Sequence, residues 1–346
     1  MPESLRILSS AQAPENLPGI DVPSSNTDRF GRRIDYLRIA ITDRCNLRCV
    51  YCMPSEGVEL GPRDEVLRFA EIVRVAAVAR RIGFKKFRIT GGEPLVVKDV
   101  LRLIGDLRQA TLGASLALTT NGIFLASMAE ALHQAGVERL NISLDTLRPE
   151  RFRALTRRDG LDAVLMGLDR ALEIGFSRLK INAVIVRGIN DDELLELAHL
   201  ARDRDIDVRF IERMPLDGHV DEGFLGADAI IACLGQDLDL VRMNPEDPRQ
   251  AAQLMFKVEG FKGRIGVVAP RSQKFCASCN RMRLTPSGDL KGCLLSEGTL
   301  ALRPFLRQGI SDAELERLLL YAIGIKPFEY QNNHYGLDRP MIAIGG

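Results

Sequence analysis

Six of the seven cysteines fall into two compact sets of three, and this pattern constrains the chain more than any other feature. The sets are Cys45, Cys49 and Cys52, within eight residues, and Cys276, Cys279 and Cys293, within eighteen. A structural zinc site takes four ligands, usually in two matched pairs, and the four histidines lie far from the first set in the sequence. Three thiolates on a four-iron cluster would instead leave one iron open to a further ligand.

Composition and charge exclude several classes of protein. The 346 residues include 47 Lys and Arg against 46 Asp and Glu, and the net charge of +1 provides no general attraction for nucleic acid or anionic lipid. With 46% apolar residues the chain can form a core, and no run of 18 apolar residues predicts a membrane span. Residues 1–27 are rich in Pro, Ser and Asn and lack an apolar signal region, so we expect a flexible tail and a cytoplasmic protein.

Short β-like runs alternate with helical patterns from Tyr36 onward. Strands are predicted at 36–42, 86–90, 115–120, 139–144, 179–184 and 208–212. Helices are predicted at 69–82, 99–109, 125–134, 161–173, 192–204 and 312–322. Six strands alternating with helices indicate parallel βαβ units in an open sheet or a barrel. Because the alternation of strands and helices ends after about residue 222, we predict an α/β domain over 28–222 and a C-terminal cap over 223–346.

Within the predicted strands, polar and apolar residues alternate. Arg38 and Thr42 share one face and Leu37 and Ile39 the other, and the strands near residues 88, 141 and 180 follow the same pattern. Parallel strands covered on both faces are usually apolar throughout. Since the apolar face must pack on helices, the polar face would point into a cavity, which requires a polar ligand. The alternative is a half-exposed sheet with solvated charges.

The first cysteine loop, Cys45-Asn46-Leu47-Arg48-Cys49-Val50-Tyr51-Cys52, resembles the CxxxCxΦC motif of radical S-adenosylmethionine (SAM) enzymes, where Φ is aromatic. Two further motifs of that family follow in order: Gly91-Gly92-Glu93-Pro94 and Ser143-Leu144-Asp145. The resemblance implies a partial (βα)6 TIM-type barrel and a [4Fe-4S] cluster whose open iron binds SAM. It assigns four residues to SAM: Tyr51, Gly92, Ser143 and Met214. Met214 taken alone would more often fill a core.

The second cysteine set resembles that of the GTP 3′,8-cyclase family. The resemblance runs from about Asp28 to Gly346 and rests on these stretches: residues 28–32 (DRFGR), 36–38 (YLR), 42–45 (TDRC), 209–212 (RFIE), 276–283 (CASCNRMR) and the terminal Gly345-Gly346. Departures are small, with Ala40 where the family commonly has Ser and Leu47 where it commonly has Phe. Taken alone, the second set could be half of a zinc ribbon.

Membership of that family implies a radical SAM lyase. It would convert GTP to (8S)-3′,8-cyclo-7,8-dihydroguanosine 5′-triphosphate, the first step of molybdenum cofactor biosynthesis. The second cysteine set would hold a second [4Fe-4S] cluster that contacts guanine in the cap. The implied GTP-binding residues are Arg38, Arg88, Thr119, Lys180, Arg281 and Arg283, the last two also catalytic. The Gly-Gly end would reach the active site. Implied partners are an electron donor and a downstream cyclic pyranopterin synthase; nucleic acid and membranes are not expected, and a homodimer is compatible.

Two other functions are compatible with part of the sequence pattern. A peptide-modifying maturase with an auxiliary cluster would share the first cysteine motif but would not need Arg281-x-Arg283 or the Gly-Gly end. A zinc-dependent nucleic-acid-binding module fits the second set, but aromatic residues are only 5% of the chain and Trp is absent, which disfavours base stacking. We interpret Cys233 as a buried thiol in an apolar helix, and we assign no role to Lys86 or to residues 215–222.

Overall fold

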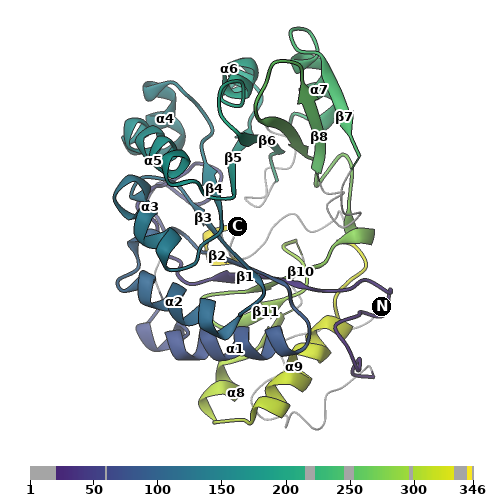
Figure 1. Ribbon diagram of the computed structural model, residues 1–346. Helices are drawn as coiled ribbons and strands as arrows, with labels where there is room; N and C mark the ends of the chain where they lie inside the picture. Colours follow the sequence, from purple (N-terminus) through teal and green to yellow (C-terminus); the bar gives the residue numbers. More distant parts are fainter. Residues whose placement is uncertain are drawn as a thin grey trace. The chain divides into compact units, whose positions relative to one another are not determined.

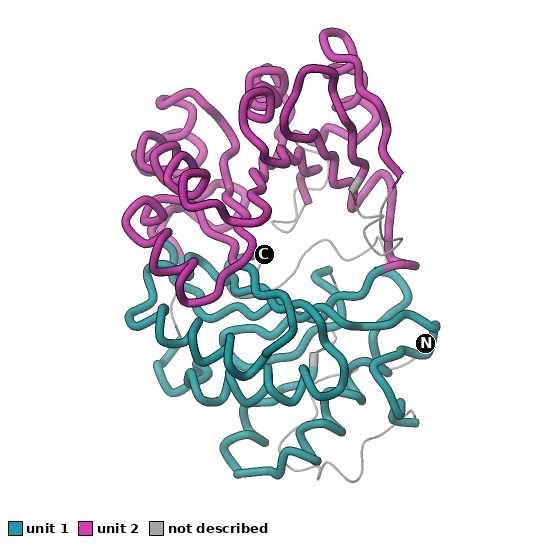
Figure 2. The backbone as a smooth tube through the Cα atoms, in the orientation of Figure 1, with its two compact units in different colours: residues 1–45, 58–117, 279–346 teal, residues 46–57, 118–278 magenta. Residues whose placement is uncertain are grey.

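The computed structural model describes residues 21–58, 61–214, 223–244, 253–295, 299–330 and 341–344 (Figure 1). The chain forms two compact units, each built from separate stretches of the sequence (Figure 2). Unit 1 comprises residues 1–45, 58–117 and 279–346, and unit 2 comprises residues 46–57 and 118–278. The boundary passes through strand β3 (Ser115–Thr120).

Unit 1 contains a sheet whose strands come from both ends of the chain. Its central strand β1 (Tyr36–Ala40) pairs in parallel with β2 (Lys86–Thr90) on one side and with β10 (Arg281–Leu284) on the other. Two antiparallel strands, β11 (Asp289–Lys291) and β12 (Thr299–Ala301), extend the order to β12-β11-β10-β1-β2. Residues more than 240 positions apart in sequence therefore share one sheet.

The helices of unit 1 are α1 (Phe69–Arg81), α2 (Val100–Ala110), α8 (Arg303–Arg307), α9 (Asp312–Gly324) and α10 (Met341–Ile344), with 3-10 turns at Arg63–Glu65 and Pro94–Val96. Helix α1 packs against α2 and α9, as Figure 1 shows. Its buried residues Ile72, Val75, Ala76, Val78 and Ala79 lie on one side of the helix and form an apolar stripe. Ser311 and Glu314 cap the first turn of α9 reciprocally.

Unit 2 contains a second set of parallel strands. They are β4 (Arg139–Ser143), β5 (Arg178–Ile185), β6 (Ile206–Glu212) and β9 (Arg264–Val268), in that order. Antiparallel β8 (Gln253–Val258) and β7 (Leu240–Met243) continue from β9. The helices are α3 (Leu125–Gln134), α4 (Pro149–Thr156), α5 (Leu161–Ile174), α6 (Leu194–His199) and α7 (Ala227–Leu234), with 3-10 turns at Asp191–Glu193 and Cys276–Ser278.

The predicted alternation of polar and apolar strand faces is present, most regularly in β5. Leu179, Ile181, Ala183 and Ile185 are buried, whereas the residues between them are half-buried. On β1 and β2, Leu37, Ile39 and Phe87 are at most 1% exposed. The apolar face of these strands thus forms the core, and the polar residues occupy the other face.

The structure confirms the predicted α/β class with parallel strands, and all six predicted strands and six predicted helices have counterparts within a few residues. The prediction missed α4, α8, α10 and strands β7 to β12, and it made α6 too long. Strands β9 and β10 are short and lie after residue 222, where helices and strands no longer alternate regularly. Each nevertheless pairs in parallel with an earlier strand of its own unit, β9 with β6 and β10 with β1. Position 222, the predicted domain boundary, falls inside unit 2, and the division at that position stays a prediction.

Most of the predicted N-terminal tail lies outside the described residues. Where the description begins, the chain is already held in place by Asn26, which is 7% exposed and donates from its amide to the carbonyls of Ile34 at 3.0 Å and Gly83 at 3.3 Å. Thr27 also forms a bridge with Arg33. No helix among the described residues is long and apolar enough to span a lipid bilayer.

Candidate active site

In unit 1, the strand register brings five cationic residues together. Arg38 on β1 lies opposite Arg88 on β2 and Arg283 on β10. One layer away, Tyr36 lies opposite Lys86 and Arg281. Because paired residues in a sheet point to the same face, the five cations and Tyr36 form one cluster. Arg38, Arg88, Arg281 and Arg283 were predicted to bind substrate, and the structure brings all four together.

Burial and neighbouring like charges lower the pKa values of two arginines in this cluster. Burial and the neighbouring guanidinium groups of Arg283 and Arg88 lower the pKa of Arg38 to about 9. Burial, followed by Arg281, lowers the pKa of Arg283 to about 10. Shifts of this size in arginine mean that the folded protein holds several like charges in a site with little water. An anionic ligand with several charges would relieve that repulsion.

Tyr36 lies among these cations, and sequence analysis gave it no role. Its hydroxyl accepts a hydrogen bond from Nε of Arg88 at 2.6 Å, and Nζ of Lys86 lies 4.6 Å from its ring centroid. Burial raises the pKa of Tyr36, but Arg88, Arg38 and the other cations outweigh burial and hold this pKa well below 10. Lys86, which the sequence analysis set aside, therefore belongs to the cluster. The sequence pattern that could have identified Lys86 is its position on the polar face of β2, two residues before Arg88.

The predicted SAM residue Gly92 lies against the backbone that leads into Cys45. Its N–H donates to the carbonyl of Thr42 at 2.8 Å, and a Cβ at Gly92 would stand 2.2 Å from the carbonyl oxygen of Arg44. A Cβ at Gly91, where φ is +149°, would stand 2.5 Å from the oxygen of Thr42. Only glycine permits this approach. The Gly-Gly pair therefore fixes the segment that carries Cys45.

The other two cysteines of the first set lie in unit 2, around Tyr51. The Tyr51 hydroxyl donates to a carboxylate oxygen of Asp145 at 2.5 Å. Burial, then the negative charges of Asp145, Cys49 and Cys52, raise the pKa of Tyr51 well above 10. Burial also raises the pKa of Asp145 to about 6, although it accepts hydrogen bonds from Tyr51 and from the N–H of Val184. The predicted motif residue Asp145 thus fixes the orientation of the aromatic residue between two cysteines.

Unit 2 has its own line of charged residues on the polar face of β5, β6 and β9. Lys180 forms an ion pair with Asp207, whose other oxygen accepts from Nε of Arg264 at 2.7 Å. Arg209 donates to the side-chain oxygen of Asn182. Burial, then Arg209, lower the pKa of Lys180 to about 8. Asp207 and Arg209 were not among the predicted site residues, but both lie on the strand face that the alternation identified.

Glu212, the last residue of the RFIE stretch (residues 209–212), has a structural role. Its side chain is fully buried and accepts hydrogen bonds from the N–H of Ala227 at 2.8 Å, Arg271 at 2.9 Å and Ser272 at 3.1 Å, as well as from the Ser272 hydroxyl. A buried carboxylate with this many donors is well compensated. It joins the start of α7 to the loop that precedes Cys276.

Two cysteines of the second set, Cys279 and Cys293, lie in unit 1 near Lys326. Nζ of Lys326 is 3.6 Å from Sγ of Cys279. Burial raises the pKa of the Cys279 thiol, but Lys326 and Arg281 outweigh it and hold the pKa below its ordinary value. Cys276 precedes Cys279 by three residues and lies in the 3-10 turn Cys276–Ser278 of unit 2.

The remaining predicted residues have these positions. Thr119 lies on β3, Ser143 ends β4, and Met214 follows β6; all three are half-buried. Gly345 and Gly346 lie outside the described residues, although Ile342 just before them is buried and its Cδ1 lies against Gly92. The interpretation of Cys233 as a buried thiol was wrong, because its side chain is exposed near the end of α7. The buried face of this apolar helix consists of Ala227, Ile230 and Leu234, and Cys233 is not on it.

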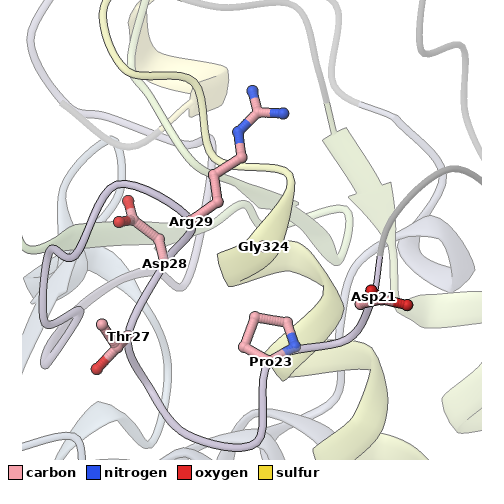
Figure 3. A pocket seen from close by; sticks show the side chains of 6 residues that line it. All are labelled: Asp21, Pro23, Thr27, Asp28, Arg29 and Gly324. Atoms are coloured by element: carbon pink, nitrogen blue, oxygen red, sulfur yellow. The ribbon is translucent and has the colours of Figure 1, made fainter.

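A surface pocket in unit 1 contains none of the predicted site residues. It is lined by Asp21, Pro23, Thr27, Asp28, Arg29 and Gly324, as Figure 3 shows. The side chain of Arg29 extends away from Pro23 and Thr27 in this view.

The cysteine thiols of the two sets are suitable ligands for iron–sulfur clusters. All six cysteines of the two sets are half-buried and outside disulfides, so each set offers three thiol groups with restricted access to water. Over the described ranges, no three His, Cys, Asp or Glu side chains gather around a point that could hold a single metal ion. Burial of the ligands and nearby polar or charged groups tune the reduction potential of an iron–sulfur cluster. Here the thiols are shielded from bulk solvent, Tyr51 is adjacent in the first set, and cations lie near the second set.

Comparison with protein families defines the class first. Residues 39–201 match the profile of the Radical SAM superfamily, and residues 206–332 match that named Molybdenum Cofactor Synthesis C. Together with the parallel α/β fold and the first cysteine loop, these matches define a radical SAM protein.

Curated relatives then define the family. A GTP 3′,8-cyclase of Moorella thermoacetica is 42% identical over 322 residues, covering 92% of this chain and 99% of the relative. The mitochondrial GTP 3′,8-cyclase of Arabidopsis thaliana is 41% identical, covering 99% and 90%. Molybdenum cofactor biosynthesis protein 1 of Bos taurus is 41% identical, and the chain spans about half of its length (51%). The chain belongs to the GTP 3′,8-cyclase family.

Among solved structures, SuiB of Streptococcus suis with bound S-adenosylmethionine has a TM-score of 0.57 and 16% identity, covering 89% of this chain and 66% of SuiB. This likeness concerns the fold alone. It is consistent with the parallel α/β architecture and carries no information about substrate.

Replacing Gly92 by Ala should disrupt the segment before Cys45, because the new Cβ would collide with the Arg44 carbonyl. We expect at least a tenfold loss of SAM affinity in the reconstituted protein, measured by equilibrium dialysis. Gly105→Ala in α2 is the matched control, since nothing lies within 4 Å of the added methyl group, and it should leave SAM binding unchanged and stabilise the helix by about 0.5–1 kcal/mol. Equal SAM affinity in both variants would contradict the role assigned to Gly92.

Proposed function

We propose that this protein converts GTP to (8S)-3′,8-cyclo-7,8-dihydroguanosine 5′-triphosphate, the first step of molybdenum cofactor biosynthesis. The observation that carries the proposal is the cation cluster of β1, β2 and β10, whose lowered arginine pKa values call for a ligand with several negative charges. A nucleoside triphosphate meets that requirement. Relatives covering nearly the whole chain carry the name GTP 3′,8-cyclase, which favours this function over a peptide-modifying maturase.

The cofactors in this proposal are SAM and two [4Fe-4S] clusters. Cys45, Cys49 and Cys52 would hold the first cluster, and Cys276, Cys279 and Cys293 the second. When bound, the first cluster and SAM would supply the radical chemistry that acts on the ribose. Tyr51, Gly92, Ser143 and Met214 would bind SAM, with Asp145 holding the Tyr51 hydroxyl in place.

The chain's own residues would bind and orient GTP. Arg38, Arg88, Arg281 and Arg283 present guanidinium groups suited to forked contacts with phosphate oxygens. Lys180 and Thr119 complete the proposed set, to which we add Lys86 because it lies opposite Tyr36 in the same cluster. Because Lys180 is paired with Asp207, an arriving phosphate would compete with that carboxylate for the ammonium group. Arg281 and Arg283 would also act on the reacting nucleotide.

Several further assignments belong to the same proposal. An external electron donor would reduce the clusters, and the product would pass to a cyclic pyranopterin synthase. We place the protein in the cytoplasm. The residues after 222 would form the functional cap, with the Gly-Gly end reaching the substrate.

Single Cys→Ser replacements at positions 45, 49 and 52 should abolish formation of 5′-deoxyadenosine, because the first cluster would lose a thiolate ligand. Chromatographic detection of 5′-deoxyadenosine after anaerobic reconstitution and reduction measures this. Cys233→Ser is the control, since that thiol is exposed and outside both sets, and it should retain wild-type iron content and turnover. Full SAM cleavage by all three variants of the first set would end the radical SAM proposal for this chain.

Arg281→Ala and Arg283→Ala should separate SAM cleavage from cyclisation. Each loses a charge-assisted contact with GTP, which weakens binding of substrate or transition state by about 1.5–3 kcal/mol, while the cysteine ligands remain. We expect near-normal iron content and 5′-deoxyadenosine, with the cyclised nucleotide reduced at least tenfold at limiting GTP. A product-to-deoxyadenosine ratio equal to that of the wild type would place the substrate site elsewhere.

GTP affinity should fall above pH 8 because of Lys180. Its pKa of about 8 lies below the ordinary 10.5, so the ammonium group is charged at pH 7 and mostly neutral at pH 9. If the phosphate binds only the charged form, the contribution of Lys180 weakens roughly tenfold between pH 7 and 9. Calorimetric titration with GTP, without reductant, measures this. Lys180→Arg keeps its charge and should show a smaller pH dependence; identical dependence in both proteins would contradict the assignment.

A further inference from the structure

We propose that Lys326 is a positioning residue for the second cysteine set, holding the segments that carry Cys279 and Cys293 together and placing an ammonium group beside them. This inference rests on the proposed function, because that function includes a second cluster. It assigns a role to a buried lysine that neither the cysteine motif nor the substrate residues account for.

The contacts of Lys326 connect two segments of unit 1. Its side chain is among the fully buried ones, with the residue 2% exposed. Nζ donates to the carbonyl of Arg281 at 3.0 Å and to the carbonyl of Gly292, and it lies 3.6 Å from Sγ of Cys279. Gly292 directly precedes Cys293, and Arg281 follows Cys279 by two residues. One ammonium group therefore bridges both thiol-bearing segments.

The site is built to admit this side chain closely. A Cβ at Gly292 would lie 3.2 Å from the Cα, Cβ and Cγ atoms of Lys326, so a larger residue there would press on the lysine stem. A lysine ammonium has three N–H donors, and the two carbonyls and the sulfur provide three acceptors. Burying a charge without partners is costly, and here every donor has one.

A second group of contacts fixes the chain beside Lys326. Arg32 donates to the carbonyls of Pro327 at 2.7 Å and Phe328 at 2.8 Å. Its guanidinium is held by a buried ion pair with Asp28 at 2.7 Å and lies 5.3 Å from the ring centroid of Phe30. The DRFGR stretch at residues 28–32 thus acts on the segment that carries Lys326, nearly 300 residues later in the sequence.

The expected consequence concerns the cluster that the thiols would bind. A cluster held by thiolates carries negative charge, which increases on reduction, so a fixed cation next to two of its ligands favours the reduced form. Without that cation the cluster should be reduced at a more negative potential. Without the two carbonyl contacts its ligand segments should separate more easily, and iron should be lost.

The test uses a full chain in which Cys45, Cys49 and Cys52 are all changed to Ser, so that iron reports only on the second set. After anaerobic reconstitution this parent should hold about four irons. Lys326→Met keeps the length of the side chain but removes its charge and donors. We expect it to lose at least half of the iron, or to retain iron with a more negative midpoint potential measured by electron paramagnetic resonance.

Two controls separate this effect from general damage. Lys262→Met, at an exposed position, should match the parent in both iron content and potential. In a chain with Cys276, Cys279 and Cys293 changed to Ser instead, Lys326→Met should keep about four irons in the first set. Loss of iron in that chain as well would show a global defect and overturn the positioning role.

The outcomes distinguish the inference from the proposed function. If the parent binds no cluster, the second cluster of the proposed function fails. If the parent binds a cluster and Lys326→Met matches it in iron and potential, the inference is wrong. If circular dichroism shows that Lys326→Met does not fold, Arg32→Lys serves as the second test variant. It keeps the positive charge but loses the forked contacts with the carbonyls of Pro327 and Phe328. Reduced iron in Arg32→Lys supports the inference, and parental iron and potential overturn it.

Discussion

The burial of like charges on adjacent parallel strands is the constraint on which the rest of this structure depends. Strands β1, β2 and β10 place Arg38, Arg88 and Arg283 opposite one another, and burial holds the pKa values of Arg38 and Arg283 below their ordinary value of 12.5. Burial disfavours the charged form of an arginine, and a neighbouring guanidinium group disfavours it further. In the proposed function, the phosphates of GTP would bind at this cluster and stabilise the charged forms.

Buried polar groups also fix the segments on which the cysteines lie. Gly92 brings one loop against the backbone before Cys45, Asp145 orients Tyr51 between Cys49 and Cys52, and Lys326 bridges the segments of Cys279 and Cys293. In each case a short polar contact or a close backbone approach constrains a segment with little regular structure. These contacts limit the movement of the segments that carry the thiols.

Much of the fold could be predicted from local pattern. The alternation of Leu179 and Ile181 with polar residues identified β5 and its buried face, and the helical pattern over residues 69–82 identified α1. Strands β9 and β10 could not be predicted in this way, because they are short and pair with strands far away in the sequence. Cys233 was placed wrongly because a short apolar helix does not reveal which of its sides faces solvent.

The sequence by itself determined the chemistry of the candidate site: the two sets of three thiols, the Gly-Gly pair and the cations on alternating strand positions, since each is defined by residue type and short spacing. Only the tertiary structure decided which of these groups meet. Arg283 lies beside Arg38, Lys180 pairs with Asp207, and Lys326 reaches Cys279, because strand pairing and burial connect positions separated by 27 to 245 residues. Partners at such distances are selected by packing and electrostatic compensation across the whole unit, which local sequence patterns do not record.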